Sequence, residues 1–405
     1  MMGDANRPSH LGEAIPKEPP LLWTTSQTDQ FELAFQSPEK VPLEYLDDLG
    51  STNKPGDRGA TVSRERSTET GLVLAAKSAV FKNTCEDVKS EVEILRKLVG
   101  TRHIIQIVGT FMCGPNYTIL LFPATQYNLS EYLSVVGDKD PDSSGDDKKH
   151  LSTFFGCLAK GLEYIHNSGV RHKDVKPENI LVDLERKTIC HADFGISKDF
   201  SGHDMSSVSF GPRVRGSKMY LSPECSRKME RSRPSDIFSL GCVFSEIWTV
   251  IKGLTLKEFY EQRSRGSSVA DFCKTLDRVL AWIYHLDLLE PLSEFEEMGQ
   301  VIISMLDELP SRRPSAKRVW AMFAGMTQVV AGIEHFEFCG SCCTPRPAEL
   351  TRLLMANTSP KVELRNSAQE PANYEGVLAV ILSWPTASNR PSYADRDGQR
   401  DSTSK

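Results

Sequence analysis

No stretch of this sequence approaches the ~20 consecutive apolar residues that cross a bilayer. The best candidate, Gly376 to Trp384, is far too short. Ten cysteines among 405 residues are too few for the disulfide-dense scaffold of a small secreted protein. The chain also lacks an excess of positive charge, because it has 48 Lys and Arg against 54 Asp and Glu and a net charge of −6. The chain has no global positive field, so we expect neither a membrane span nor a nucleic-acid partner.

Targeting signals are missing as well. The start of the chain does not follow the basic-then-apolar order of a secretory signal peptide. Gly3 stands behind two methionines, which does not fit the myristoylation pattern. We therefore expect a cytoplasmic protein, with a nuclear location left open. Hydrophobic residues make up 39% of the chain, which is enough to bury a core.

Composition divides the chain into three stretches. Residues 1–42 hold six prolines among polar residues and predict a disordered or loosely docked lead. Residues 43–338 contain the regular apolar patterns of a folded domain. Within them, residues 138–149 hold five Asp and three Lys, which predicts a solvated acidic insert. Residues 339–405 predict a cysteine-containing, largely disordered tail.

The folded stretch changes from strands to helices along the chain. Short apolar runs predict strands, and apolar residues at helical spacing predict helices. The strand candidates are 71–76, 104–108 and 117–122, and the helix candidates are 86–98, 151–166 and 237–248. This order predicts an α+β fold of two lobes. A small β-rich lobe with one helix covers about 43–122, and a larger, mostly helical lobe covers about 126–338.

The densest group of polar side chains lies between Val170 and Gly195. Its members are Asp174, Lys176, Asn179 and Asp193, on loops between short predicted strands. Phosphoryl transfer needs hard oxygen ligands for Mg²⁺, a cation near the phosphate and an acceptor for the proton of the attacking hydroxyl. These side chains supply all three.

The sequences His172-Lys-Asp-Val-Lys-Pro-Glu-Asn179 and Asp193-Phe-Gly195 resemble the catalytic loop and the magnesium loop of the eukaryotic-type serine/threonine protein kinase superfamily. The resemblance implies a two-lobed kinase fold with ATP and Mg²⁺ as cofactors. It also implies that Asp174 is the catalytic base and that Lys176 contacts the γ-phosphate. Asn179 and Asp193 are then the two Mg²⁺ ligands.

An upstream lysine and glutamate extend the resemblance. Lys77 ends an apolar strand, and Glu91 follows fourteen residues later. In the family such a lysine pairs with the α- and β-phosphates and such a glutamate holds it. Glu93 is a nearby competitor for that place, although Glu91 has the better spacing from Leu95. For a lone Lys–Glu pair, a surface salt bridge is the alternative interpretation.

The nucleotide pocket is less regular. The resemblance implies that Val62, Ala75 and Leu181 contact the nucleotide, with Val62 and Leu181 packing on the adenine. The family's Gly-x-Gly-x-x-Gly hairpin is degenerate here, and Gly50 and Gly59 are the candidate phosphate-loop glycines. Glycine permits close approach of the backbone to phosphate, so its loss predicts reduced ATP affinity. A plain surface turn is the alternative.

Motifs farther along the chain agree with the resemblance. Gly216 to Glu224 is similar to the end of a kinase activation segment, and Arg313 is similar to the family's closing arginine. We expect Arg313 to pair with Glu224 as a structural bridge. Lys176 and Ser217 favour a serine/threonine kinase over a tyrosine kinase, and together with Arg313 they argue against a small-molecule kinase.

Two departures leave a rival open. Lys173 replaces the arginine that precedes the catalytic aspartate in the family, and lysine lacks the bidentate fork that grips a phosphorylated loop. Pro123 stands at the predicted hinge and donates no N–H. The sequence predicts a kinase that transfers the ATP γ-phosphate to Ser/Thr hydroxyls of protein substrates. A pseudokinase or scaffold with weak or no transfer is the alternative, and the oligomeric state is not determined.

Four further residues cluster at and just after the end of the kinase-like region: His335, Cys339, Cys342 and Cys343. Cys-x-x-Cys is typical of a zinc knuckle. Two adjacent cysteines and the lack of a second Cys-x-x-Cys pair argue against a complete zinc site. Lipidation, redox chemistry and ordinary thiols are the other interpretations.

Overall fold

The computed structural model describes residues 32–35, 41–51, 60–80, 85–140, 144–199, 218–228, 232–265, 269–289, 296–326 and 337–345. The chain divides into two compact units that alternate along the sequence. The first is formed from Met1–Leu129, Lys160–Lys173 and Pro177–Met205, and the second from Ser130–Ala159, Asp174–Lys176 and Ser206–Lys405. None of the described helices has the length and apolarity that crossing a membrane requires.

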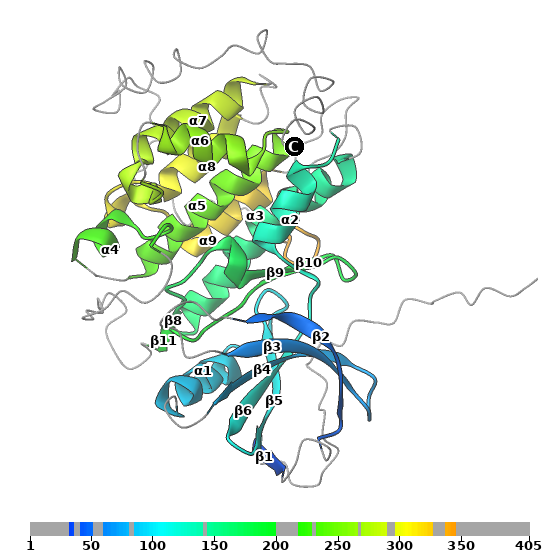
Figure 1. Cartoon of the computed structure of the whole chain (residues 1–405). Coiled ribbons are helices and arrows are strands. Elements are labelled where there is room, and N and C mark those ends of the chain that lie inside the picture. The colour runs from blue at the N-terminus through cyan, green and yellow to red at the C-terminus, as the bar shows by residue number, and fades with distance from the viewer. Residues whose placement is uncertain are drawn as a thin grey trace, which may run out of the picture. The chain divides into compact units, whose positions relative to one another are not determined.

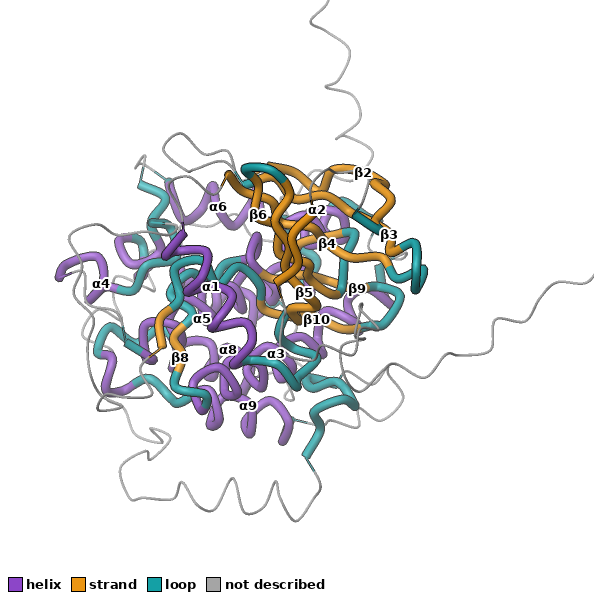
Figure 2. Tube along the Cα trace, turned by 90° about the horizontal axis from the view of Figure 1, so that it is seen from below, coloured by secondary structure: helices purple, strands orange, loops and turns teal. Residues whose placement is uncertain are grey.

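A six-stranded sheet dominates the first unit (Figure 1). Its strands are β1 (Glu32–Phe35), β2 (Leu43–Ser51), β3 (Thr61–Ser67), β4 (Val73–Val80), β5 (Gln106–Cys113) and β6 (Asn116–Phe122), in the order β1-β5-β6-β4-β3-β2. Only β1 pairs in parallel, with β5, and the other neighbours in this sheet are antiparallel. Figure 2 shows the strands as neighbouring orange tubes.

Alternation along the strands builds the core of this sheet. Leu74 and Ala76 on β4 point to one face, as the two-residue period of a strand requires, and both are fully buried. They pack with Val108 and Phe111 of β5 and with Leu120 of β6 in the same sheet. Because Lys77 follows Ala76, its side chain must leave on the opposite face of β4. The strand thus presents one charged group away from an apolar cluster.

Helix α1 (Cys85–Lys97) packs against β5. Its buried residues Val92, Ile94 and Leu95 lie at helical spacing with Glu91, which is also buried. The first unit further contains a three-stranded sheet of β7 (Tyr127–Asn128), β9 (Ile180–Asp183) and β10 (Thr188–His191), with the short helix η4 (Pro177–Asn179) directly before β9. A last pair joins β8 (Val170–Arg171) to β11 (Lys198–Asp199).

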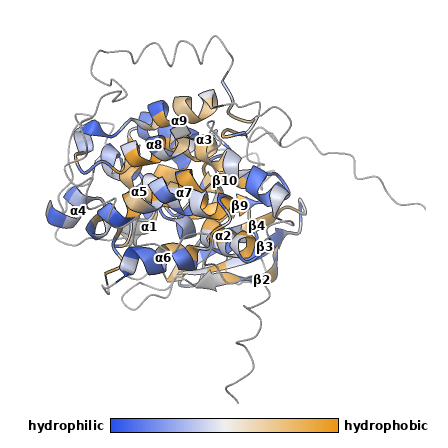
Figure 3. Ribbon diagram, turned by 90° about the horizontal axis from the view of Figure 1, so that it is seen from above, coloured by the Kyte–Doolittle hydropathy of each residue, from blue (hydrophilic) through white to orange (hydrophobic). Residues whose placement is uncertain are grey.

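Helices form the second unit. They are α2 (Leu129–Gly137), α3 (Gly145–Asn167) up to its residue Ala159, α4 (Pro223–Lys228), α5 (Arg233–Ile251), α6 (Leu256–Ser264), α7 (Leu276–Leu288), α8 (Glu296–Met305) and α9 (Ala316–Gly325), with short turns η5 (Phe272–Lys274) and η6 (Pro310–Arg312). Helix α5 contacts α6, α7 and α8. It is buried almost throughout, as expected for a central helix, and Figure 3 shows its apolar colouring beside the polar α4.

The predicted α+β order, with a β-sheet region followed by a helical region, is confirmed. Two details differ from the sequence-based expectation. Part of the proline-rich lead forms β1, because its backbone hydrogen bonds are completed by β5, from Glu32 opposite Thr110 to Phe35 opposite Cys113. The apolar run 104–108 becomes strand only from Gln106 onward.

The acidic insert 138–149 is also less open than its composition suggests. Helix α3 begins at Gly145, six residues before the expected start at Leu151. Asp146 and Asp147 lie in its first turn, where the helix dipole favours negative charge. Asp147 accepts hydrogen bonds from the Tyr132 hydroxyl at 3.1 Å and from the Lys139 ammonium at 2.6 Å. Local partners therefore convert part of a charge-rich run into helix.

Candidate active site

A lysine shared by two carboxylates forms the charged centre of the first unit. Lys77 Nζ on β4 lies 2.7 Å from Glu91 Oε1 on α1 and 3.2 Å from Asp193 Oδ1 after β10. The Lys77 and Glu91 side chains are only 18% and 7% exposed, whereas Asp193 is 43% exposed. The two partners of Lys77 thus differ in exposure: Glu91 is buried, whereas Asp193 is partly exposed to solvent.

The pKa values of this group follow from burial and charge. Burial alone lowers the pKa of Lys77, but attraction to Glu91 and Asp193 outweighs burial and raises that pKa. The pKa of Glu91 is raised as well, because burial and the nearby Asp193 charge together exceed the attraction of Lys77. Both directions agree with one ammonium shared by two carboxylates. Lys77 stays protonated at neutral pH.

The loop that carries Asp193 is held in an uncommon backbone conformation. Asp193 has φ 60°, in the left-handed region that costs most non-glycine residues about 1–2 kcal/mol. Its neighbours fix it there. Phe194 is buried with its ring centroid 4.8 Å from that of His172, and the Ala192 N–H donates to the Asn179 carbonyl at 2.8 Å. Ser197 Oγ donates to the His172 carbonyl at 2.8 Å.

The other predicted residues of the first unit lie on its strands and on η4. Asn179 ends η4 and is 6% exposed. Val62 on β3 pairs with Lys77 on β4 and with Gly50 on β2. Ala75 on β4 is 6% exposed, and Leu181 on β9 is half-buried. Gly59 and Ser217 lie outside the described residues, so the structure does not place them.

The second unit contains the remaining predicted pair. Lys176 Nζ donates to Asp174 Oδ2 at 2.7 Å, and the two side chains are 8% and 10% exposed. The pair is therefore close-set and largely shielded from water. Lys173, directly before Asp174 in the sequence, has φ 69°. Lys173 and Asp193 thus both have left-handed backbone, and each stands directly before a predicted site or core residue, Asp174 and Phe194.

A second buried ion pair lies in the same unit, as predicted. Arg313 binds Glu224 through two parallel hydrogen bonds of 2.7 and 2.8 Å. Arg313 also donates to the carbonyls of Asp307, Pro234 and Glu308, and its side chain is completely buried. Burial raises the pKa of Glu224, but the hydrogen bonds and charge of Arg313 outweigh burial and lower it.

The first unit's residues fit a divalent cation and phosphate. Asp193 supplies a carboxylate and Asn179 an amide oxygen, which are the hard ligands that Mg²⁺ prefers. Asp193 is 43% exposed although Lys77 lies beside it, so a ligand can reach its carboxylate from solvent. Lys77 is held charged and directed by Glu91 rather than left mobile. The chemical class that matches this donor set is a magnesium-bound polyphosphate.

Comparison with known proteins shows the family of the chain. A family model described as "Protein kinase domain" matches residues 56–322. The chain belongs to the protein kinase family. The matched range lies inside the stretch 43–338 that the sequence analysis assigned to the folded domain.

Individual relatives are more distant. The chain is 26% identical to Mitogen-activated protein kinase kinase kinase 2 of Arabidopsis thaliana over 350 residues, 82% of this chain and 48% of the relative. It is 29% identical to Mitogen-activated protein kinase kinase kinase 3 of the same plant, over 81% of this chain and 48% of the relative. It is also 29% identical to Serine/threonine-protein kinase Nek8 of Danio rerio, over 63% of this chain and 33% of the relative. The chain thus spans less than half the length of each of these relatives.

One cysteine escaped the sequence analysis. Cys157 belongs to the apolar stripe of α3, and its sulfur lies 3.6 Å from that of Cys342 and 3.4 Å from that of Cys343. Nothing in the pattern around Cys157 distinguishes it from a core residue. Its only sequence signal is that it is one of several cysteines outside the Cys-x-x-Cys motif. His335, which the sequence analysis grouped with these cysteines, lies outside the described residues.

Proposed function

We propose that this protein is a serine/threonine protein kinase, which transfers the γ-phosphate of ATP to Ser/Thr hydroxyls of protein substrates with Mg²⁺. The observation that carries the proposal is the buried, permanently charged Lys77 between Glu91 and Asp193. A lysine in such a setting offers a fixed positive charge to phosphate oxygens. A fixed charge stabilises the transition state without the cost of reorienting at the moment of reaction.

Phosphate binding is assigned to the first unit. Asp193 and Asn179 would hold Mg²⁺, which neutralises phosphate charge and orients the γ-phosphate for in-line transfer. Lys77 binds the α- and β-phosphates, and Glu91 positions Lys77. Val62, Ala75 and Leu181 contact the nucleotide, with Gly50 and Gly59 near its phosphates. This part of the proposal is supported by the donor set and by the burial of the residues around it.

Hydroxyl activation is assigned to Asp174. Its carboxylate orients the acceptor hydroxyl and accepts its proton as the bond to phosphorus forms. Lys176, 2.7 Å from that carboxylate, carries the positive charge that meets the transferring γ-phosphate. The pair is shielded from water, which strengthens its electrostatic effect on the transferring group.

The choice of Ser/Thr over Tyr rests on the chain's own residues. Lys176 stands two positions after Asp174, as in serine/threonine kinases, and Ser217 stands where these kinases commonly carry a threonine. The relative from Danio rerio is itself named a serine/threonine-protein kinase. The pseudokinase alternative rests on the degenerate glycine loop and on Lys173.

A transfer assay tests the proposal. The full chain and its Asp174→Asn variant are incubated with Mg·ATP and a generic protein substrate, and transfer of γ-phosphate is followed. Glu185→Gln, an exposed carboxylate on the turn between β9 and β10, is the matched control. We expect the parent and the control to transfer phosphate to serine or threonine and Asp174→Asn to fall to background. Equal background from all three contradicts transfer and favours the pseudokinase.

Two further readouts separate the parts of the proposal. Phosphotyrosine as the sole product contradicts the serine/threonine assignment while leaving the kinase assignment intact. A rise in melting temperature with millimolar Mg·ATP is expected from binding to the native state. If Asp174→Asn keeps that rise but loses transfer, the nucleotide site and the base are distinct functions of the chain, as proposed.

A further inference from the structure

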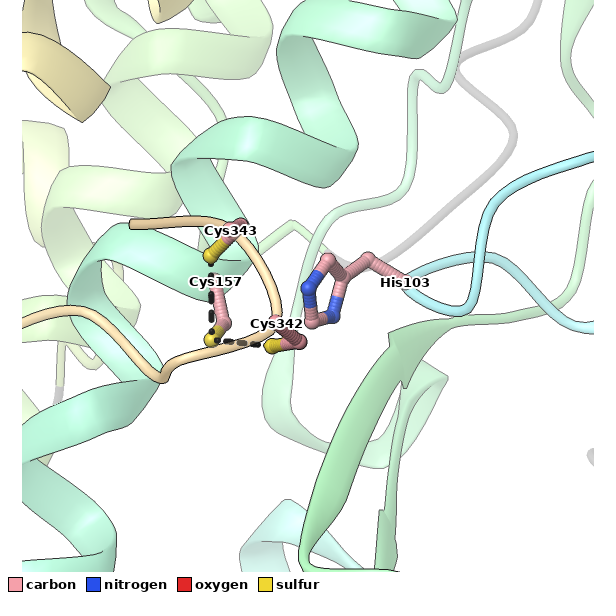
Figure 4. A group of neighbouring side chains, drawn as sticks. All are labelled: His103, Cys157, Cys342 and Cys343. Atoms are coloured by element: carbon pink, nitrogen blue, oxygen red, sulfur yellow. Dashed lines mark hydrogen bonds between the residues drawn. The ribbon is translucent and has the colours of Figure 1, made fainter. Parts of the chain in front are cut away.

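Four cysteine sulfurs gather in the second unit, although they come from two distant parts of the chain. Cys157 lies on α3, and Cys339, Cys342 and Cys343 lie on the segment 337–345. The sulfurs of Cys157, Cys342 and Cys343 all lie within 4.8 Å of one another, and Figure 4 shows them converging. Cys339 joins the group, with its sulfur 3.1 Å from that of Cys343. We refer to these four residues as the cysteine cluster.

The cluster is built by ordered backbone contacts. The Phe338 carbonyl accepts a hydrogen bond from the Gly156 N–H at 2.8 Å, and the Glu337 carbonyl accepts one from Ser152 Oγ at 2.9 Å. On the other side, Trp320 Nε1 of α9 donates to the Cys343 carbonyl at 3.1 Å. The segment 337–345 is therefore attached to both α3 and α9 within this unit.

A tight turn directs the three sulfurs of the segment. The N–H groups of Cys343 and Thr344 both donate to the Gly340 carbonyl, at 3.0 and 3.1 Å. Gly340 allows this close approach, because a Cβ there would lie 3.0 Å from Cys157 Sγ and 3.3 Å from Cys342 Sγ. The turn thus leaves the backbone of Gly340 against the sulfurs, with no side chain between them.

Helix α3 is equally adapted at its contact with the segment. A Cβ at Gly156 would lie 2.7 Å from Cys339 Cβ and 2.8 Å from its sulfur, which real side chains do not tolerate. Glycine in a helix interior costs about 1 kcal/mol relative to alanine. Its presence beside Cys157 permits the cysteine turn to reach the helix surface. Two glycines therefore clear space for the four sulfurs.

The sulfur separations discriminate among the chemical states of the cluster. The sulfur–sulfur distances are 3.1 Å for Cys339 and Cys343, 3.4 Å for Cys157 and Cys343, and 3.6 Å for Cys157 and Cys342. A disulfide places its sulfurs about 2.05 Å apart. Tetrahedral zinc with Zn–S bonds of about 2.3 Å places them about 3.8 Å apart. The observed separations lie nearer to the metal geometry. Thiols are weak hydrogen-bond donors, so mutual hydrogen bonding gives little reason to collect four of them.

We propose that Cys157, Cys339, Cys342 and Cys343 bind one Zn²⁺ as thiolates, in a closed tetrahedral site. Binding exchanges protons for the metal: four thiols and one Zn²⁺ give the four-thiolate complex and four protons. No electron transfer or further reactant is involved. A closed four-sulfur site leaves no position for substrate, so the ion is structural. It joins the segment 337–345 to α3, independently of whether the chain transfers phosphate.

Metal analysis of the purified full chain tests the proposal. The protein is produced with zinc in the medium, without a polyhistidine tag or chelator, and zinc per chain is measured by elemental analysis and native mass spectrometry. We expect about one zinc per chain in the parent. Cys157→Ser and Cys342→Ser are expected to lose it. Cys273→Ser, a cysteine of the same unit outside the cluster, is the matched control and is expected to retain it.

Stability provides a second readout. A chelator is expected to lower the melting temperature of the parent and of Cys273→Ser, and to leave that of Cys342→Ser unchanged, because this variant has no zinc to lose. Cys342 is exposed, so its serine variant is the one least expected to disturb packing. If Cys157→Ser does not fold, the Cys342→Ser comparison still tests the site.

Cobalt replacement tests the ligand set in the parent chain. Tetrahedral thiolate coordination gives Co²⁺ intense visible absorption, whereas coordination by water and carboxylates does not. Three results overturn the proposal: a parent without zinc whose cysteines react as free thiols, an intact mass lower by two or four hydrogens from disulfides, or zinc that all cysteine variants retain. Transfer activity has no part in any of these outcomes, so a failed kinase assay leaves them unaffected.

Discussion

The two units each bury an ion pair, and the pairs differ in one respect. Arg313 in the second unit donates to both oxygens of Glu224 and to three backbone carbonyls, so its guanidinium is saturated. Lys77 in the first unit is divided between Glu91 and a second carboxylate, Asp193, which stays 43% exposed. A saturated pair has no bonding capacity left for a ligand. A pair with an exposed member can be reached by a ligand, which is why we propose a binding role for the Lys77 group and a structural role for the Arg313 bridge.

The largest effect is expected from breaking the saturated pair. Arg313→Met leaves the Glu224 carboxylate buried without its partner, so we expect the free energy of unfolding to fall by about 3–5 kcal/mol. The urea midpoint measures this. Arg312→Met, an exposed neighbour, is the control and should change little. If the free energy of unfolding falls by less than about 1 kcal/mol in Arg313→Met, water has replaced the arginine as the partner of Glu224.

Removing the exposed carboxylate of Asp193 should have the opposite effect: it should reduce activity and leave stability nearly unchanged. Asp193→Asn is expected to lower phosphate transfer at least about 100-fold, the scale of losing one preorganised electrostatic contact. Its melting temperature should stay near that of the parent, because Asn tolerates left-handed backbone and the site is open. Asp199→Asn, in β11 and 44% exposed, is the control. Equal losses of activity in both variants would remove the assignment to Asp193.

Lys77→Met sharpens the comparison. We expect loss of transfer together with a fall in unfolding free energy of about 1–3 kcal/mol, smaller than for Arg313→Met. The reason is that the pKa of Glu91 is already raised, so this carboxyl can bind a proton once the lysine is gone. Protonation stabilises the folded variant, so its deficit should shrink as the pH falls toward 5. A pH-independent deficit between pH 5 and 8 would argue against this reasoning.

The pH dependence of the second pair has the opposite sign. Arg313 lowers the pKa of Glu224 in the folded state below its ordinary value of 4.5. The bridge therefore contributes its full stability above about pH 4.5 and loses it as the pH falls through the lower folded pKa. Melting curves between pH 3 and 6 should show less acid destabilisation in Glu224→Gln than in the parent. Parallel curves would mean that Glu224 does not titrate differently in the two states.

The smallest effect belongs to an exposed pair. Lys97 Nζ lies 2.6 Å from Asp199 Oδ2, but the side chains are 30% and 44% exposed. Solvent screens such a pair, so Lys97→Met should change the free energy of unfolding by less than about 1 kcal/mol. Chemical denaturation measures it. A loss as large as that of Arg313→Met would show that short distance outweighs burial in this protein.

Much of the fold was predictable because its signals are local. The short apolar run that becomes β4 and the helical stripe of α3 mark those elements from neighbouring residues alone. The start of α3 was missed, because it depends on hydrogen bonds that Asp147 accepts from Tyr132 on α2 and from Lys139 just after α2. β1 was missed for a related reason. Its strand forms by pairing with β5, 78 residues farther along the chain (Glu32 opposite Thr110), and the identity of such a distant partner cannot be read from the lead's own residues.

The sequence by itself determined the kinase family, the α+β order and the linear positions of Lys77, Glu91, Asp174, Asn179 and Asp193, because each rests on spacing along the chain. Only the tertiary structure decided which carboxylate is buried beside Lys77 and which is exposed. It also decided that Cys157 meets the cysteines of 337–345. Burial and long-range contact are properties of packed surfaces, and a pattern of neighbours along one chain does not contain them.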